Sequence, residues 1–433
     1  MLIAPSSYGA LSATSANTIQ GSRPGFAGHS GAKKLGFKIG NTTYSESEGN
    51  LSPSSSGVIN YFNAGLTLND FNVTSLTASD FSPANDYADA DGDVAHPTTP
   101  FSMSPRTFEW RDSAGALIPT ADYNKTLGCG SNLNLPLKLK ITLPDVKVKS
   151  RYGNPSESIP TPLVQEYKIG TATGICFAKP NQMIVDPSHT WFDVRSLSWN
   201  SGNPTPDTTV GGGYSSDFDP VNGFKASLTT KFPTTGFPKA SFTLIMVGNA
   251  SNYTFSVLKP DGSLLTDGSV TVDTTGKVTL NSKPSGAVTI QAIFKNDTSQ
   301  VHSYTFNPTT VWVVPKLNPA DYFRTYNYAE AITQCGVESK IPSRAELTNS
   351  PYKTGYEGVS IPTNAFTRAV GGGVFGEWGW TDSTTYPGSQ WYSSINSPYW
   401  TREAYSSSYR FFVRTAGSVN YYNVDSGYVA CLR

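Results

Sequence analysis

Short runs of alternating apolar and polar residues, separated by turn residues, constrain the fold of this chain more than any other feature of its sequence. Alternation with a period of two is typical of strands that bury one face. Six such runs lie close together, at residues 232–233, 240–245, 253–257, 269–272, 277–280 and 287–292. Their spacing predicts one β-sandwich over residues 218–308, since a seven-stranded sandwich needs roughly 100 residues.

The segment before this sandwich is also predicted to be rich in strands. Residues 1–55 read as a partly flexible lead-in or edge strands, and residues 56–217 read as an N-terminal, sandwich-like β domain that ends in a Gly/Pro linker. Residues 133–148 alternate cleanly, and Pro144-Asp145 suggests a turn between two strands there. With 39 glycines and 30 prolines, the composition favours a mostly β chain with frequent turns.

The last part of the chain, residues 309–433, is predicted to be an α+β domain. A helix is expected before Cys335, and Gly336 suits its C-terminus because glycine tolerates a positive φ. A second helix is expected at Ser343, where Glu346 stands three residues later and completes a capping box. Short strands and many aromatic residues follow.

Four well-separated cysteines predict two disulfides rather than a metal site. None forms a CxxC pair, and only four histidines are scattered along the chain. Four cysteines allow three connectivities, and nesting by domain favours Cys129–Cys176 and Cys335–Cys431. Disulfides indicate an oxidising, extracellular compartment.

An acidic cluster in the N-terminal domain suggests calcium. Asp89, Asp91 and Asp93 alternate along the chain around a glycine, and Ca²⁺ takes six to eight oxygen ligands from a tightly turned backbone. A full calcium loop would also need an aspartate at 87 and a glutamate downstream, and neither is present. The alternative is a solvated Asp/Gly turn.

Several classes of function are disfavoured by the sequence. The formal net charge is zero and 15% of residues are charged, so no electrostatic footprint for nucleic acid or an anionic membrane is visible. The motifs of serine hydrolases, zinc proteases and P-loop enzymes are missing, and we expect no catalysis. No apolar run is long enough to span a membrane, so no membrane insertion by this chain is expected. An extracellular composition without a convincing signal peptide leads us to expect further sequence upstream.

The aromatic residues of the last domain are the best candidates for binding. Tyrosine, tryptophan and arginine dominate interface hot spots. Trp378, Trp380 and Trp400 lie in strand-like contexts and are expected in the core. The aromatic residues predicted to bind a ligand lie among Ser, Gly and Pro, where surface loops are expected: Tyr386, Trp391, Tyr392, Tyr405 and Tyr409. Arg402, also predicted to bind the ligand, and Arg410 would frame this patch.

Together these segments resemble the passenger tip of invasin/intimin-type surface adhesins of enteric bacteria, also called inverse autotransporters. Residues 270–280 resemble the V-D-x-x-G-x-V-T hairpin of bacterial immunoglobulin-like domains, and residues 309–433 resemble a C-type-lectin-like domain. The resemblance rests on Val272-Asp273, Gly276, Val278-Thr279, residues 328–335, 341–347, 377–380, 399–401 and 429–431. The last domain lacks Glu-Pro-Asn, Gln-Pro-Asp and Trp-Asn-Asp, the residues of calcium-dependent sugar sites.

The resemblance implies a non-catalytic adhesin at the bacterial cell surface, which binds a host-cell surface protein or glycan, or extracellular matrix, through its lectin-like domain. One alternative is a carbohydrate-binding module, dependent on calcium through the N-terminal domain. Another is a structural stalk with no receptor. Sensitivity to a chelator would distinguish the first alternative from the adhesin.

Overall fold

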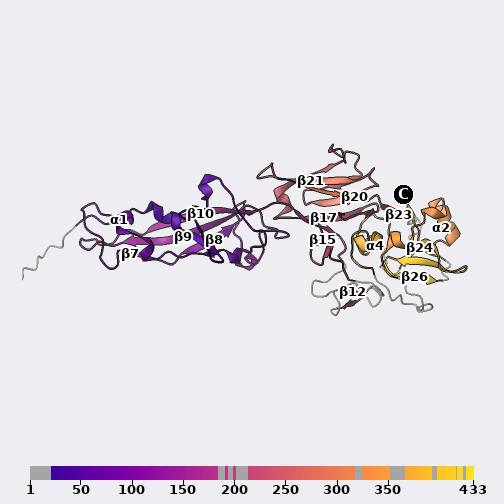
Figure 1. Cartoon of the computed structure of the whole chain (residues 1–433), viewed down its shortest axis with the longest axis horizontal. Coiled ribbons are helices and arrows are strands. Elements are labelled where there is room, and N and C mark those ends of the chain that lie inside the picture. Colours follow the sequence, from indigo (N-terminus) through magenta and orange to yellow (C-terminus); the bar gives the residue numbers. More distant parts are fainter. Residues whose placement is uncertain are drawn as a thin grey trace, which may run out of the picture. The chain divides into compact units, whose positions relative to one another are not determined.

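The chain forms two compact units in a computed structural model (Figure 1). Unit 1 consists of Met1–Thr126 and Leu135–Thr171, and unit 2 consists of Leu127–Asn134 and Ala172–Arg433. The structure describes residues 21–183, 191–193, 198–200, 213–316, 324–351, 366–392, 397–415, 417–422 and 426–433. Most of the expected Gly/Pro linker, at 201–212, lies outside these ranges.

Strands are the main regular elements of unit 1. A five-stranded sheet has the order β4-β10-β9-β7, with β8 paired to β9 as well, and a three-stranded sheet has the order β3-β2-β5. The elements are β1 (Gly25–Phe26), β2 (Gly36–Ile39), β3 (Thr42–Ser45), β4 (Asn60–Phe62), β5 (Asn72–Val73), α1 (Pro83–Asp86), β6 (Tyr87–Ala88), β7 (Phe101–Met103), β8 (Thr107–Arg111), β9 (Leu137–Val148) and β10 (Thr161–Thr171). Short 3-10 turns lie at His29–Lys34, Ser54–Ser56, Leu68–Asp70, Ala78–Asp80 and Thr120–Asp122.

The two sheets of unit 1 enclose an aromatic core. Phe37 of β2 packs against Phe71, with ring centroids 5.1 Å apart, and Phe71 packs against Trp110 of β8 at 5.3 Å. Tyr167 of β10 is fully buried, and its hydroxyl donates to the carbonyl of Leu35 at 2.5 Å. These contacts join the two sheets, as expected for a sandwich-like domain.

The predicted turn at Pro144-Asp145 is wrong, because β9 runs unbroken through both residues. The register of β9 against β10 shifts between Leu143 and Val146, so that β9 carries one extra residue. Proline cannot donate to the ladder, and a bulge is one of the few places where a sheet tolerates it. Pro144-Asp145 therefore marks a bulge in β9 rather than a turn, because the strand pairs on either side keep the chain extended.

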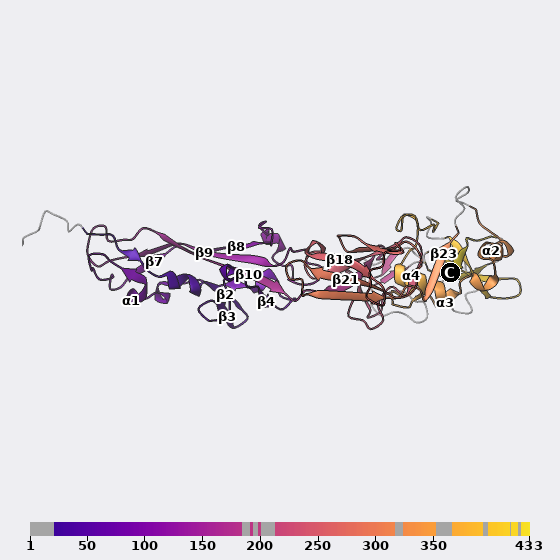
Figure 2. The same cartoon turned by 90° about the horizontal axis from the view of Figure 1, so that it is seen from above.

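Unit 2 begins with a two-sheet sandwich (Figure 2). One sheet has the order β14-β15-β11-β17-β20-β19, and the other has the order β18-β21-β22. Their strands are β11 (Ile175–Pro180), β14 (Phe218–Asp219), β15 (Gly223–Lys225), β17 (Ala240–Met246), β18 (Tyr253–Leu258), β19 (Val270–Val272), β20 (Lys277–Leu280), β21 (Val288–Phe294) and β22 (Val301–Phe306). Two further strands, β12 (Trp191–Asp193) and β13 (Ser198–Asn200), pair with each other, and a 3-10 turn lies at Ala250–Asn252.

Five of the six predicted runs form strands of this sandwich. Phe242 of β17 packs against Phe306 of β22 with ring centroids 5.5 Å apart, which joins the two sheets. The sixth run, Phe232-Pro233, is not a strand: its peptide bond is cis, and Phe232 packs inside the core. Strand β11 precedes the boundary expected at residue 218 but pairs with β15 and β17, so this sheet takes in chain from both sides of that boundary.

The remainder of unit 2 is the expected α+β part. The strand β16 (Thr235–Gly236) pairs with β23 (Val311–Pro315), which pairs with β27 (Ala430–Leu432), and this sheet ties the sandwich to the last residues of the chain. The other elements are α2 (Tyr328–Cys335), α3 (Arg344–Leu347), α4 (Gly373–Trp378), β24 (Pro398–Ala404), β25 (Arg410–Arg414), β26 (Val419–Tyr422) and a 3-10 turn at Glu338–Lys340. Both predicted helix signals are confirmed: Gly336 ends α2 with φ +90°, and Ser343 and Glu346 form a capping box.

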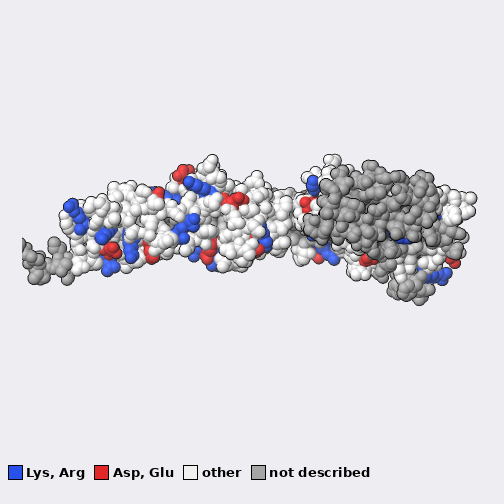
Figure 3. All heavy atoms as spheres, turned by 90° about the horizontal axis from the view of Figure 1, so that it is seen from below, with Lys and Arg blue, Asp and Glu red and all other residues white. Residues whose placement is uncertain are grey.

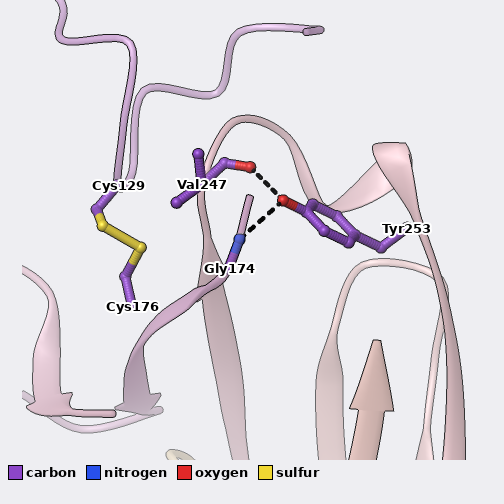
Figure 4. Close-up of a disulfide and its surroundings, with 5 residues drawn as sticks. All are labelled: Cys129, Gly174, Cys176, Val247 and Tyr253. Carbon is purple, nitrogen blue, oxygen red and sulfur yellow. Dashed lines mark hydrogen bonds between the residues drawn. A yellow bond between two sulfur atoms is a disulfide. The ribbon is translucent and has the colours of Figure 1, made fainter. Parts of the chain in front are cut away.

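Both predicted disulfides are present. Cys335–Cys431 joins the end of α2 to β27, and Cys129–Cys176 joins the 127–134 segment to β11. Both Cys129 and Cys176 fall within the range 56–217 predicted for the N-terminal domain, but in the structure both belong to unit 2. Beside it, the Tyr253 hydroxyl donates to the carbonyl of Val247 at 2.9 Å and accepts from the amide of Gly174 (Figure 4).

Charges of both signs are mixed over the face of unit 1 that Figure 3 draws, in agreement with the zero net charge. In the residues that the structure describes, no helix is long and apolar enough to cross a membrane.

Three Asp-x-Ser turns are expected to make the sandwich of unit 2 less stable in acid. Asp261, Asp267 and Asp297 each accept hydrogen bonds from the hydroxyl and backbone amide of the serine two positions later, and these bonds lower the pKa of each carboxyl. A lowered pKa in the folded state gives stability that is present above the unfolded value of about 3.9 and is lost as the pH falls through the folded value. We expect the triple Asp→Asn variant to lose less stability than the parent between about pH 4 and pH 2, as measured by urea unfolding at each pH. An equal loss of stability in the parent and the triple variant would show that these three carboxylates do not cause the acid sensitivity.

Candidate functional site

A cluster of tyrosines lies at the turn between β24 and β25. The ring of Tyr405 stacks on Tyr421 of β26 with centroids 3.7 Å apart, and Tyr409 meets Tyr421 edge-on at 6.0 Å. Tyr409 is 38% exposed, and the other two rings are half-buried. We call Tyr405, Tyr409 and Tyr421 the tyrosine cluster.

The turn that carries this cluster is held by its own backbone and by serine. The amide of Tyr405 donates to the carbonyl of Tyr409 at 2.9 Å, and the Ser406 hydroxyl accepts from the amides of Ser408 and Tyr409. Serine side chains stabilise turns through such local bonds. Tyr405 and Tyr409 are therefore presented on a defined turn, and Tyr421 lies beside them on β26.

Arg410 lies next to the cluster and is already engaged. Its guanidinium lies 3.6 Å from the centroid of the Tyr328 ring, and its Nη2 lies 3.3 Å from the carboxylate of Glu338. The Tyr328 hydroxyl donates to the same carboxylate at 2.8 Å, and burial, followed by this bond, raises the pKa of Tyr328. Arg410, Tyr328 and Glu338 thus link β25 to the start of α2 and to the 3-10 turn that follows this helix.

Arg402 was predicted to contact a ligand, and the structure places it in a supporting contact. Its Nη1 lies 2.7 Å from the carboxylate of Glu346, the residue that closes the capping box of α3. The backbone amide of Arg402 donates to the carbonyl of Pro342 at 3.1 Å. The half-buried guanidinium thus joins β24 to α3.

The predicted exposure of Tyr386 and Trp391 is wrong, because both side chains are fully buried. The ring of Phe237, from the sandwich, meets Tyr386 edge-on at 5.2 Å and Trp391 at 5.7 Å. The Tyr386 hydroxyl donates to the carbonyl of Trp378 at 2.6 Å. Their Ser/Gly/Pro neighbours do form loops, but these loops pack against the sandwich.

Tyr392 is half-buried and stacks on Tyr428 with centroids 4.5 Å apart. Its backbone amide donates to the hydroxyl of Tyr399 at 2.9 Å. Of the five aromatic residues predicted to bind a ligand, only Tyr405 and Tyr409 belong to the tyrosine cluster. Trp378 and Trp400 lie in the core as predicted, and Trp380 packs partly buried against it.

The three aspartates predicted to bind calcium in unit 1 face different partners. Asp89 accepts from the amides of Asp91 and Asp93, while the Asp91 carboxylate accepts from the amide and hydroxyl of Ser22. Gly92 adopts φ +82°, as the tight turn requires. The described residues contain no group of three or more His, Cys, Asp or Glu side chains that would hold a metal ion. The geometry therefore agrees better with the alternative, a structured Asp/Gly turn.

A buried glutamate joins the α+β part of unit 2 to its sandwich. Glu377 of α4 is fully buried, and its carboxylate accepts from the amides and hydroxyls of Thr234 and Thr235 and from the amide of Gly371, at 2.7–3.0 Å. Burial raises the pKa of Glu377, and these hydrogen bonds partly offset that rise. Next to it, the indole N–H of Trp378 donates to the carbonyl of Thr235 at 3.1 Å.

A buried arginine lies at the same junction. The guanidinium of Arg368 lies over the rings of Phe218 and Phe224, 4.7 and 5.5 Å from their centroids. Its Nη2 donates to the carbonyl of Gln182 at 3.0 Å. Burial lowers the pKa of Arg368 to about 10, which still leaves the side chain charged at neutral pH.

Sequence reasoning missed Tyr421, Tyr328 and the junction residues Glu377 and Arg368. Tyr421 sits in a strand whose pairing with β25 brings it opposite Phe411. Glu377 lies in an apolar stretch, Val374 to Trp380, where an isolated carboxylate is unusual because buried charges are rarely tolerated without partners. The sequence thus shows that Glu377 is unusual, but it does not show which groups donate hydrogen bonds to its carboxylate.

Comparison with known proteins supports the resemblance over the sandwich. Residues 216–306 match a family model described as invasin, domain 4, which confirms the likeness to invasin-type adhesins for this segment. A comparison with curated proteins found no match.

Three solved structures are similar to parts of the chain. Invasin, described as a bacterial integrin-binding protein, aligns with a TM-score of 0.38 and 15% identity over 80% of this chain. A mutant intimin of EHEC O157:H7 aligns with a TM-score of 0.30 and 20% identity, over 50% of this chain and 93% of the intimin chain. Intimin in complex with Tir90 aligns with a TM-score of 0.30 and 21% identity, over 47% of this chain and 89% of the intimin chain. The chain spans 53% of the invasin chain. Because these TM-scores are low, the similarity to invasin-type adhesins rests on the family model that matches residues 216–306.

Proposed function

We propose that this chain is the receptor-binding tip of a non-catalytic bacterial surface adhesin, and that it contacts a protein on the host-cell surface through the tyrosine cluster. The observation that carries the proposal is the grouping of three tyrosine rings, one of them 38% exposed, at the β24–β25 turn and on the neighbouring strand β26 of unit 2. The two disulfides support the extracellular localisation that this proposal requires.

The chemistry of the cluster favours a protein surface. Tyrosine offers a large, rigid contact area at a small cost in side-chain entropy, together with a hydroxyl for hydrogen bonding. The neighbouring cations Arg402 and Arg410 each lie against a glutamate within the chain. The partner surface therefore does not have to neutralise a strong local charge, and burial of ring area would supply most of the binding energy.

The names of the similar proteins point the same way. Invasin is described as an integrin-binding protein, and intimin was solved in complex with Tir90. We propose a protein partner of that general kind for this chain, in which an N-terminal β module, the sandwich and the α+β part follow one another.

The test uses the full chain and intact host cells. We expect the double variant Tyr405→Ala/Tyr409→Ala to bind cells at least about 30-fold more weakly, since hot-spot tyrosines contribute about 2 kcal/mol or more. The matched control is Tyr61→Ala/Tyr152→Ala, which removes two tyrosines, each 55% exposed, from unit 1.

Two outcomes would contradict the proposal. One is unchanged cell binding by a folded Tyr405→Ala/Tyr409→Ala variant, with folding checked by thermal unfolding. The other is binding that survives protease treatment of the cells and is abolished by removing their glycans, which would indicate a carbohydrate receptor.

A further inference from the structure

A pocket of about 290 Å³ lies on unit 2, away from the tyrosine cluster. It is formed where the 127–134 segment and the β14–β15 turn meet the outward side chains of β11 and β17. Gly130, Asn132, Lys179, Asn222 and Thr243 are among the residues that line it. Its volume is at the lower end of the range for small-molecule sites, roughly 300–1,000 Å³, and suits a single sugar ring.

The walls of this pocket are fixed in place before any ligand arrives. The Cys129–Cys176 disulfide ties the 127–134 segment to β11, as Figure 4 shows. The amide of Gly130 donates to the carbonyl of Met246, and the amide of Gly248 donates to the carbonyl of Gly128, both at 3.2 Å. A preorganised site loses little conformational entropy when it binds.

The opposite wall is held by an aspartate. Asp219 accepts from the amides of Val221 and Asn222 at 2.9 and 2.7 Å, which fixes the turn between β14 and β15. The Lys179 ammonium donates to the carbonyl of Val221 at 2.8 Å. This bond uses one of its three N–H groups, and two remain for a ligand.

Three polar side chains of the pocket are not committed elsewhere, whereas the hydroxyl of Thr275 donates to Asp273. Within the part of the chain that the structure describes, the side-chain amides of Asn132 and Asn222 and the hydroxyl of Thr243 make no hydrogen bond. Amides and hydroxyls both donate and accept, as sugar hydroxyls do. Ile245 and Val221 supply apolar surface beside them.

The charge of the pocket selects among small polar ligands. Lys179 is its one ionisable lining residue, and no aspartate or glutamate is among the described residues that line it. A single ammonium among neutral donors and acceptors matches one carboxylate surrounded by hydroxyls.

We propose that this pocket binds the carboxylated ring of an acidic sugar, with Lys179 at the carboxylate and Asn132, Asn222 and Thr243 at the hydroxyls. The tip would then hold a glycan-binding site in its sandwich, separate from the tyrosine cluster and independent of the protein receptor proposed above. N-acetylneuraminate and D-glucuronate carry this chemistry in different types of glycan.

Isothermal titration of the full chain with N-acetylneuraminate, D-glucuronate, D-glucose and inorganic phosphate tests the proposal. We expect at least one acidic sugar to bind about tenfold more tightly than D-glucose, a difference that one charge-assisted contact supplies. Lys179→Met is expected to remove this preference. Lys225→Met, which changes an exposed lysine of β15 outside the pocket, is expected to leave it intact.

A second variant tests the pocket independently, in case Lys179→Met does not fold. Asn132 is exposed, its side chain makes no hydrogen bond to the described residues, and its backbone has φ +55°, which glycine adopts without strain. Asn132→Gly is therefore expected to fold like the parent and to weaken acidic sugars severalfold. The proposal is overturned if neither acidic sugar binds, if Asn132→Gly and Lys179→Met both bind like the parent, or if phosphate displaces the sugar and binds as tightly.

Discussion

Replacing Glu377 with alanine is expected to lower the free energy of unfolding of unit 2 by about 3–5 kcal/mol, because buried polar groups that lose their partner cost this much. The carboxylate satisfies the amides of Thr234, Thr235 and Gly371 and two hydroxyls in a region from which water is excluded. Alanine leaves all of these donors without an acceptor and also leaves a cavity. Denaturant titration of the full chain, followed by tryptophan fluorescence, measures the loss.

Glu330→Ala is the matched control for Glu377→Ala. Glu330 is an exposed glutamate that accepts from the amide of Asn327 at the start of α2, and its loss is expected to cost about 1 kcal/mol or less. Equal effects of the two substitutions would show that Glu377 does not join the α+β part of unit 2 to the sandwich. The same result would weaken the proposed function, since a loosely attached tip presents its tyrosines less rigidly.

Removal of the Cys335–Cys431 disulfide is expected to cost about 4 kcal/mol, because the bridge closes a loop of nearly a hundred residues and restricts the unfolded chain. The two cysteines are 96 positions apart, and the bridge connects the helix α2 to the last strand, β27. The paired variant Cys335→Ser/Cys431→Ser, compared with the parent by urea unfolding, gives the value.

The other disulfide supplies an internal comparison. Cys129 and Cys176 are 47 positions apart, about half the separation of the first pair. Loop-closure entropy changes by about 0.6 kcal/mol for each doubling of length, so Cys129→Ser/Cys176→Ser is expected to cost about that much less. A larger loss from the shorter loop would mean that native packing around Cys129 outweighs the entropy of the unfolded chain.

Local patterns in the sequence were sufficient where the controlling interactions are local. The period-two runs predicted five strands of the sandwich, and Ser343 with Glu346 predicted the start of α3, because a strand face and a helix cap depend on residues a few positions apart. The two disulfides were also predicted, since four cysteines in nested segments leave few sensible pairings.

Burial and pairing across long stretches of chain were decided by the tertiary structure. Tyr386 and Trp391 sit in Gly/Ser/Pro loops that predict exposure, yet Phe237, about 150 positions earlier, covers both rings because the α+β part packs on the sandwich. Tyr421 joined the tyrosine cluster only through the pairing of β25 with β26. Glu377 found its donors in Thr234 and Thr235, which lie more than 140 positions away.

The sequence by itself therefore determined the class of the fold, its strand-forming segments and its covalent bridges, because each depends on residue type and short-range spacing. Which aromatic rings are free to meet a partner, and which polar groups gather in the pocket beside Lys179, was decided by tertiary packing. Exposure is a property of everything that surrounds a side chain, and those surroundings come from segments that are distant along the chain.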